Sequence, residues 1–254
     1  MDYGDGVDGV SDKHRNDIYG DLEKTEGSPA IPAATVVLIR EKPELEVLML
    51  KKTANISFGG MWVFPGGKID PADYDVAETD DPLDAAKAAA VRETMEETGL
   101  SLTSNEFVWF AHWTPPPSTP KRYATWFFLA RLDDDDDIQV DGEEILKHQW
   151  IRPSDAHALH AEGKIDLAPP TWITLHQLAL YERSDELLGF LQAEPARHYE
   201  TKIVLNNEGQ RVALWSGDSA YETGNADADG GRHRLVLGAD GFVFENTVAR
   251  YRHD

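Results

Sequence analysis

The sequence contains no cysteine and no long apolar run. Without cysteine the chain has neither disulfide bonds nor thiolate chemistry. Metal ions remain possible through carboxylates, which favour Mg²⁺, Mn²⁺ or Ca²⁺. No apolar stretch approaches the roughly 18 residues that cross a bilayer. Residues 1–20 combine neither a basic start nor an apolar core, so we expect no secretory leader. The last three residues, RHD, are no peroxisomal signal, and we expect a cytoplasmic protein.

Basic residues are scarce as well. The chain has 24 Lys and Arg against 46 Asp and Glu, which leaves a net charge of −22. A surface this negative repels the phosphates of nucleic acids and of anionic membranes, so we expect neither as a partner. An anionic small-molecule substrate would have to meet a metal ion or a local basic patch.

The character of the sequence changes twice along its 254 residues. Residues 1–27 are rich in Gly and Asp and poor in large apolar side chains, which predicts a disordered acidic tail. Residues 28–195 contain both strand-like and helix-like segments and predict one domain of the α/β (α+β) class. After Pro195 apolar residues recur with period two between turn-like segments. Residues 196–254 are therefore predicted to form a small β-rich appendage.

Local signals place the individual elements. Strands are predicted at 33–40, 45–52 and 61–67, the last ending in the bend FPGG, and a polar loop at 68–81. A helix then has Asp81 as its N-cap and Pro82 in its first position, and it ends at Gly99. The later predicted elements are strands at 105–115, 122–132 and 149–153, and helices at 154–163 (capped by Ser154), 170–182 and 184–194.

The helix that ends at Gly99 carries a cluster of acids in the run VRETMEETGL, residues 91–100. Glu93, Glu96 and Glu97 project from one side of the helix, because they are three and four positions apart. Each such pair of like charges costs about 0.2–0.5 kcal/mol of helix stability. A solvated acidic face is one interpretation. The other is a seat for a hard cation such as Mg²⁺, which one or two carboxylates hold together with substrate phosphates.

The bend FPGG, the capped helix and the run RETMEETGL together resemble the signature of the Nudix hydrolase family. That signature is G-x5-E-x7-R-E-U-x-E-E-x-G-U, where U is a bulky apolar residue. Thr94 stands at one bulky position of this pattern. The residues that match its second half are Arg92, Glu93, Glu96, Glu97, Gly99 and Leu100.

The first half of the signature is stretched in this chain. Sixteen residues rather than five separate Gly67 from Asp84, which replaces the usual Glu eight positions before Arg92. Asp73 lies at the usual distance from Gly67, so an insertion of 11 residues splits the motif. The roles of Asp73 and Asp84 therefore stay open.

The resemblance implies a Nudix-type α/β/α sandwich with a mixed sheet and a role for each matching residue. Glu93, Glu96 and Glu97 would hold Mg²⁺ or Mn²⁺ or activate water, and Arg92 would be their structural ion-pair partner. Family members often supply one more acid from a later loop. Here that acid is Glu144, with Glu143 as the neighbouring alternative.

The segment FPGGKIDPADYD and the later segment HWTPPPSTPKRYATWFFLA resemble the coenzyme A diphosphatase-like branch of the family. Coenzyme A-cleaving members typically carry an Arg at the position of Ile56, so this chain departs from their pattern. The implied activity is metal-dependent hydrolysis of the pyrophosphate bond in a nucleoside diphosphate linked to another moiety, with coenzyme A or acyl-coenzyme A as one candidate. NADH, ADP-ribose or a nucleotide sugar are alternatives, and a catalytically silent ligand-binding protein is a third.

Several residues are candidates for substrate binding. Lys121 and Arg122 follow a Pro-rich turn and would contact phosphate, unless they only solubilise that turn. The Gly66–Gly67 bend would let backbone approach the ligand. Trp62 and Phe64, with Trp113, would line a pocket or simply pack a core. A homodimer formed through the hairpin edges of residues 196–254 is a further hypothesis.

Overall fold

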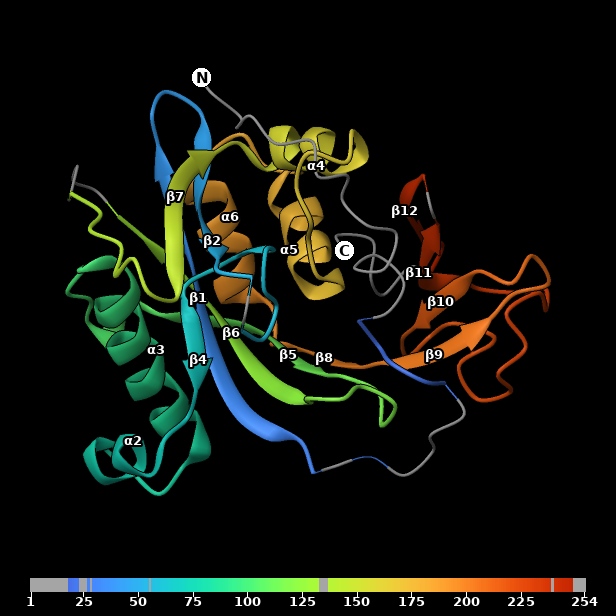
Figure 1. Ribbon diagram of the computed structural model, residues 1–254, viewed down its shortest axis with the longest axis horizontal. Coiled ribbons are helices and arrows are strands. Elements are labelled where there is room, and N and C mark those ends of the chain that lie inside the picture. Colours follow the sequence, from blue (N-terminus) through green and yellow to red (C-terminus); the bar gives the residue numbers. More distant parts are fainter. Residues whose placement is uncertain are drawn as a thin grey trace.

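The computed structural model describes residues 18–22, 27, 29–54, 56–132, 137–238 and 240–248. Its centre is a mixed sheet with helices on both faces, and a smaller sheet lies at one end (Figure 1). In this described part of the chain, no helix combines the length and the apolar character that a bilayer span requires.

The large sheet has eight strands: β1 (Ile31–Glu41), β2 (Leu45–Lys52), β3 (Trp62–Val63), β4 (Gly66–Lys68), β5 (Val108–Thr114), β6 (Tyr123–Arg131), β7 (Ile145–Ile151) and β8 (Arg197–Glu200). Six follow in the order β3-β2-β1-β6-β5-β8, while β4 pairs with β1 and β7 with β2. The pairs β1–β6 and β5–β8 are parallel and the others antiparallel. Strand β1 therefore lies at the middle of the sheet.

One face of the sheet is covered by α3 (Pro82–Thr98). Alternate residues of β1, such as Val36 and Leu38, point to this face because side chains alternate along a strand. The helix meets them through small side chains, which allow a close approach to the sheet. These are Ala85, Ala86, Ala89 and Ala90, all fully buried.

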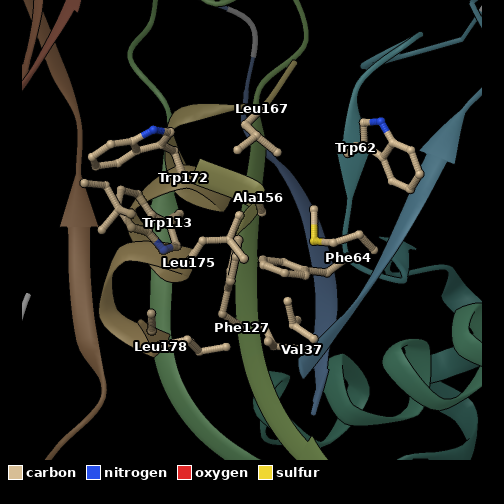
Figure 2. Close-up of a cluster of buried hydrophobic side chains, with 14 of the residues drawn as sticks. Val37, Trp62, Phe64, Trp113, Phe127, Ala156, Leu167, Trp172, Leu175 and Leu178 are labelled. Carbon is tan, nitrogen blue, oxygen red and sulfur yellow. The ribbon is translucent and has the colours of Figure 1, made fainter. Parts of the chain in front are cut away.

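The opposite face is covered by α4 (Pro153–Ala161), α5 (Pro169–Leu178) and α6 (Ser184–Ala193). Figure 2 shows part of this core, in which Val37 and Phe127 of the sheet lie beside Leu175 and Leu178 of α5. Two helical layers thus enclose one mixed sheet. The α/β/α sandwich implied by the resemblance is confirmed.

The limits of α3 agree with the prediction. The Asp81 carboxylate accepts a hydrogen bond from the Leu83 amide at 2.9 Å and caps the first turn. Gly99 ends the helix with φ of 73°, a left-handed conformation, and its N–H donates to the Met95 carbonyl. These caps orient the last two turns, which carry the acidic cluster.

Three local predictions are wrong. The strand predicted at 61–67 is divided into β3 and β4, which pair with β2 and with β1 respectively. The segment 68–81, predicted to be a loop, contains the short helix α2 (Pro71–Val76), which begins after Asp70. The Asp70 amide donates to the Asp73 carboxylate at 2.8 Å, so a side chain supplies the bond that a longer helix would make with its backbone. Ser154 is not a cap, because Pro153 already occupies the first turn of α4 and Arg152 is its N-cap.

The C-terminal strands form a second sheet. It contains β9 (Lys202–Leu205), β10 (Arg211–Leu214), β11 (His233–Gly238) and β12 (Gly241–Asn246), all antiparallel. This confirms the β-rich character predicted for the C-terminal region. The domain limits themselves stay a prediction. Strand β8 follows the predicted limit but pairs with β5 in the large sheet, and Trp215 belongs to the same hydrophobic cluster as α5.

The predicted disordered tail, residues 1–27, lies largely outside the described residues. Residues 18–22 are described and are packed on the fold. Tyr19 is buried, and the Gly20 carbonyl accepts a hydrogen bond from Arg211 Nη2 at 2.9 Å.

Candidate functional site

A cavity of about 760 Å³ lies between the acidic side of α3, the bend at β4 and the aromatic ends of β5 and β6. Its acidic end is lined by three carboxylates of α3 and by two from the loop before β7, namely Glu93, Glu96, Glu97, Glu143 and Glu144. Its apolar part is lined by Phe64, Trp113 and Phe127, among others. One chamber therefore joins anionic and apolar surfaces, as small-molecule sites commonly do.

Glu97 is the most buried of these acids, with 3% of its surface exposed. Its Oε2 accepts a hydrogen bond from the Gly66 amide at 2.9 Å. Its Oε1 has no hydrogen-bond partner and lies 3.6 Å from Lys52 Nζ. Burial raises the pKa of Glu97 to about 7, although Lys52 and the Gly66 amide act in the opposite direction. The negative charge of Glu97 is therefore only partly balanced by its neighbours, although the side chain is buried. A bound cation would balance it.

The Gly66–Gly67 bend fits tightly between β1 and α3. A Cβ atom on Gly67 would lie 2.3 Å from Glu93 Oε1, and one on Gly66 would lie 2.3 Å from the Ala34 carbonyl oxygen. Gly66 also has φ of 151°, which side-chain-bearing residues rarely adopt. Glycine at position 67 therefore lets Glu93 lie directly against the backbone, and glycine at position 66 lets the bend lie directly against β1.

Arg92 organises the neighbouring carboxylates. Its Nε and Nη2 donate to the two oxygens of Asp73 at 3.0 and 2.9 Å, a bidentate pair, and Nη2 also donates to the Lys68 carbonyl. Its Nη1 donates to Glu93 Oε1 at 2.9 Å and to Glu96 Oε2 at 3.2 Å. The pKa of Glu93 is nevertheless raised, because burial outweighs its contact with Arg92. Arg92 therefore fixes α2, the bend and α3 relative to one another.

The structure separates Asp73 from Asp84. Asp73 is 3% exposed and anchors Arg92. Asp84, in the first turn of α3, accepts hydrogen bonds from Thr79 and Lys87. The inserted segment therefore brings Asp73, and not Asp84, to the arginine.

Lys52 connects the acids of α3 to the later loop. Its Nζ lies 3.6 Å from Glu97 and 3.8 Å from Glu144, whose side chain is 61% exposed. The Asp141 carboxylate accepts hydrogen bonds from the amides of Glu143, Glu144 and Ile145, which fixes the turn that carries both glutamates. The predicted acid Glu144 and its alternative Glu143 both line the cavity.

The predicted substrate contacts divide into two groups. Gly66, Gly67, Phe64 and Lys121 line the cavity, as does Trp113. Trp62 and Arg122 are not among the residues that line it. Arg122 donates from Nε and Nη2 to the Pro115 carbonyl and so holds the Pro-rich turn. Trp62 is buried, with Lys147 Nζ 5.9 Å from the centre of its ring (its position is shown in Figure 2).

A family model described as the NUDIX domain matches residues 29–173, which is more than half of the chain. The chain belongs to the Nudix family. The matched region contains β1 to β7 and α2 to α4, and so the whole acidic end of the cavity. The resemblance seen in the run RETMEETGL is therefore confirmed.

Similar Nudix proteins include nudix hydrolase 7 of Caenorhabditis elegans, 26% identical over 183 residues, which is 58% of this chain and 60% of that protein. Acyl-coenzyme A diphosphatase NUDT19 of Homo sapiens is 28% identical over 122 residues, 45% of this chain and 32% of that protein. Each alignment covers less than two thirds of the relative. The crystal structure of a NUDIX hydrolase from Alicyclobacillus acidocaldarius has a TM-score of 0.58 at 22% identity and covers 66% of this chain and 99% of that one. It shares the fold.

Nudix hydrolases generally use divalent metal ions, and the acidic end of the cavity fits such an ion chemically. Its donors are carboxylate oxygens, the ligands that Mg²⁺ and Mn²⁺ prefer. Glu97 Oε1 is buried without a hydrogen-bond partner, which a metal would satisfy. Within the described residues no three His, Asp or Glu side chains are grouped as a metal site. Arg92 and Lys52 hold these carboxylates in ion pairs.

Sequence reasoning left part of this Nudix site unassigned. Lys52 carries no local signal of its role, and its position between Glu97 and Glu144 results from the pairing of β2 with β7. Ser57, Phe58 and Tyr123 also line the cavity. No local spacing signals them, because they come from a loop and a strand that meet only in the folded chain.

Proposed function

We propose that this Nudix protein is a divalent-metal-dependent hydrolase that cleaves the pyrophosphate bond of a nucleoside diphosphate linked to another moiety. The observation that carries the proposal is that five glutamates from α3 and the 141–144 loop line one cavity of about 760 Å³. That volume is within the range of about 300–1,000 Å³ found for small-molecule sites. A diphosphate is the anionic group that a carboxylate-bound cation would attract into an otherwise negative molecule.

The residues that would hold Mg²⁺ or Mn²⁺ are Glu93, Glu96 and Glu97. Such an ion neutralises charge on phosphate oxygens and acidifies water. Arg92, tied to Asp73, keeps Glu93 and Glu96 in place. Gly66 holds Glu97 from the other side through its amide.

Hydrolysis then requires in-line attack of a water oxygen on one phosphorus and departure of the other phosphate as the bridging P–O bond breaks. The proton lost by water passes to a carboxylate, for which Glu97 and Glu144 are the candidates. Glu97 lines the cavity with its Oε1 lacking a hydrogen-bond partner, and Glu144 lies on the facing loop. Lys121, whose exposed side chain lines the cavity, would contact the leaving phosphate.

Coenzyme A or acyl-coenzyme A is the substrate class that we favour. The human relative is named an acyl-coenzyme A diphosphatase, and the apolar wall formed by Phe64, Trp113 and Phe127 suits an apolar arm next to the diphosphate. Ile56, which lines the cavity where coenzyme A-cleaving members typically carry Arg, favours instead NADH, ADP-ribose or a nucleotide sugar. A ligand-binding protein without turnover is the remaining alternative.

A hydrolysis screen separates these options. The purified chain is incubated with coenzyme A, an acyl-coenzyme A, NADH and ADP-ribose, with Mg²⁺, with Mn²⁺ and with EDTA, and products are identified by mass. We expect metal-dependent release of 3′,5′-ADP from coenzyme A esters, whereas AMP would indicate the other substrates. The variant Glu96→Gln with Glu97→Gln should lose turnover and stay folded. Release of no phosphate product from any of the four would reject the proposal.

We also propose a homodimer formed through an edge of the small sheet. Strand β12 is an edge strand, and Val243 in it is 57% exposed. Sedimentation velocity tests this: a monomer at all concentrations would exclude it, and Val243→Lys should weaken a dimer that uses this edge.

A further inference from the structure

The loop at 56–60 forms a tight turn at the cavity. The Gly59 amide donates to the Ile56 carbonyl at 2.9 Å, and the Met61 amide donates to the Phe58 carbonyl at 3.1 Å. The Gly60 amide donates a hydrogen bond to the Lys52 carbonyl at 3.2 Å, which connects the turn to the end of β2. A Cβ atom on Gly59 would lie 2.3 Å from the Ala54 carbonyl oxygen, so the turn is also packed closely. Its conformation is fixed by backbone contacts.

Phe58 occupies an unfavourable position in this turn. Its φ is 58°, and among the described residues it alone has a positive φ without being glycine. An aromatic residue in this left-handed region is strained, because its Cβ crowds the following carbonyl. The side chain is also 36% exposed, so the strain is not offset by full burial. Strained positions of this kind cluster at active sites and ligand-binding sites, which makes Phe58 a candidate for such a role.

Polar and aromatic side chains of the same loop and of the segment 121–123 lie next to Phe58. The Tyr123 ring lies 6.1 Å from the Phe58 ring, centre to centre, at an angle of 43°. The Tyr123 hydroxyl is 3.3 Å from Ser57 Oγ, and Lys121 Nζ donates to the same Ser57 oxygen at 3.3 Å. All four side chains line the cavity. Tyr123 therefore braces Phe58 from one side and leaves part of its ring accessible.

We propose that Phe58, braced by Tyr123, is the specificity-determining residue that stacks on the nucleobase of the substrate. This inference rests on the proposed function, because it assigns the base-binding part of the same cavity. A flat base gains from an aromatic face that is held rigidly and left partly open. Lys121 and Ser57 beside the ring suit the polar and anionic edge of a nucleotide.

The buried part of the cavity suits the apolar moiety of the substrate better than the exposed Phe58 ring does. Phe64, Trp113 and Phe127 are all buried and line the cavity as an apolar wall, with the Phe64 and Phe127 rings 6.4 Å apart. A flexible apolar chain gains most where water is fully excluded. The nucleoside is therefore assigned to the exposed aromatic pair, and the group on the other side of the diphosphate to the buried wall.

The test measures base recognition without turnover. AMP and ribose 5-phosphate differ only in the base, and their dissociation constants are measured by calorimetry with Mg²⁺ present. We expect the wild-type chain to bind AMP roughly 5- to 150-fold more tightly, the range that one stacked base provides. Phe58→Tyr should keep this ratio, whereas Phe58→Leu and Phe58→Gly should reduce it towards one without changing the affinity for ribose 5-phosphate.

The Phe58→Gly variant also separates a loss of stacking from a loss of folding. Glycine accepts the positive φ of position 58 without strain, so Phe58→Gly should melt at or above the wild-type temperature. Leu205→Ala, which removes an exposed apolar side chain outside the cavity, should leave both dissociation constants unchanged.

Three results would overturn the proposal: a wild-type ratio near one, an unchanged ratio in folded Phe58→Gly, or an equal loss of affinity for both ligands. An unchanged AMP ratio with a raised KM for acyl-coenzyme A would show that the ring contacts the apolar arm instead. A failure of the proposed function would be seen in a different experiment, because the chain would then hydrolyse no diphosphate. Its preference for AMP and the effect of Phe58 could still be measured.

Discussion

At the scale of single residues, the site depends on which acids the arginine of the motif reaches. Arg92 contacts Asp73, Glu93 and Glu96, so it joins a residue from the insertion to two residues of the helix. The sequence alone could show that Asp73 and Asp84 were the two candidates for the stretched half of the motif. It could not decide between them, because the decision depends on how the inserted segment folds back onto α3.

Asp73→Asn should reduce both stability and turnover. The change removes the charge from a bidentate pair whose carboxylate is buried, and we expect a loss of about 1–3 kcal/mol in the free energy of unfolding. Released from this contact, Arg92 no longer holds Glu93 and Glu96, so the Kd for Mn²⁺ should rise. Urea unfolding and Mn²⁺ titration measure the two effects.

Asp84→Asn is the matched control for this prediction. Asp84 is held by Thr79 and Lys87 away from the acidic cluster, so its replacement should leave the Mn²⁺ affinity close to that of the wild type. A larger effect on Mn²⁺ binding from Asp84→Asn than from Asp73→Asn would contradict the assignment.

At the scale of elements, local signals predicted what they control directly. The Asp81 cap, Pro82 and Gly99 defined α3 at both ends, because each acts within one turn of the helix. The strands β11 and β12 likewise lie in the region where apolar residues recur with period two. Helix α2 was missed because it has only six residues and is stabilised by Asp73 contacts that include the distant Arg92.

The bend at β4 gives a prediction that separates function from folding. Gly67→Ala would place a methyl group against the Glu93 carboxylate, a flexible side-chain end that can move, whereas Gly66→Ala would meet the Ala34 backbone. We expect Gly67→Ala to reduce metal affinity with a small loss of stability. Gly66→Ala should lower the melting temperature more. Thermal unfolding and Mn²⁺ titration of both variants check the order, and a reversed order of stability would contradict it.

The small sheet contains a buried ion pair that should make its stability depend on pH. Asp218 accepts hydrogen bonds from Arg234 Nε at 2.7 Å and from the His233 and Ala220 amides at 2.8 Å. Burial tends to raise the pKa of Asp218, but these bonds together hold it below its usual value of 3.8. The pair therefore stabilises the fold fully above pH 3.8, and this contribution is lost as the pH falls through the lowered pKa.

Asp218→Asn should remove this dependence. At pH 7 the variant leaves the Arg234 guanidinium buried without its anion, and we expect a loss of about 3–5 kcal/mol in the free energy of unfolding. The difference in the free energy of unfolding between the variant and the wild type should begin to shrink below pH 3.8, where the unfolded wild-type chain takes up the proton. It should go on shrinking until the pH falls below the lowered pKa of folded Asp218. Urea unfolding between pH 3 and pH 7 measures this. Asp240→Asn, at an exposed turn, should change little, and a gap that is constant with pH would contradict the prediction.

At the scale of the whole molecule, the two sheets share one hydrophobic core. The Trp113 ring stacks on Tyr199 at 3.8 Å, and Trp215 of the C-terminal region lies 5.5 Å from Trp113. Phe242 of β12 lies 4.7 Å from His160 of α4. The period-two pattern of residues 196–254 was visible in the sequence. The sequence did not show that these residues complete the core of the preceding domain, because a period-two pattern does not show what a strand packs against.

Deletion of residues 202–254 should therefore unfold more than the small sheet. The truncated chain would expose the apolar surfaces that Trp215, Leu235 and Leu237 cover in the full chain. We expect it to aggregate or to lose its near-UV circular dichroism. A monomeric truncated chain with an unchanged near-UV spectrum and a cooperative melt would show that residues 28–195 form an independent domain.

The contact between Thr201 and Trp215 also sets an order of events during synthesis. Thr201 lines the cavity, and its hydroxyl accepts a hydrogen bond from the Trp215 indole nitrogen at 3.1 Å. A ribosome has released the glutamates of α3 more than 100 residues before Trp215 emerges. The nascent polypeptide therefore carries these glutamates before Thr201 and its hydrogen-bond donor Trp215 have been made, so the cavity can be completed only late in translation.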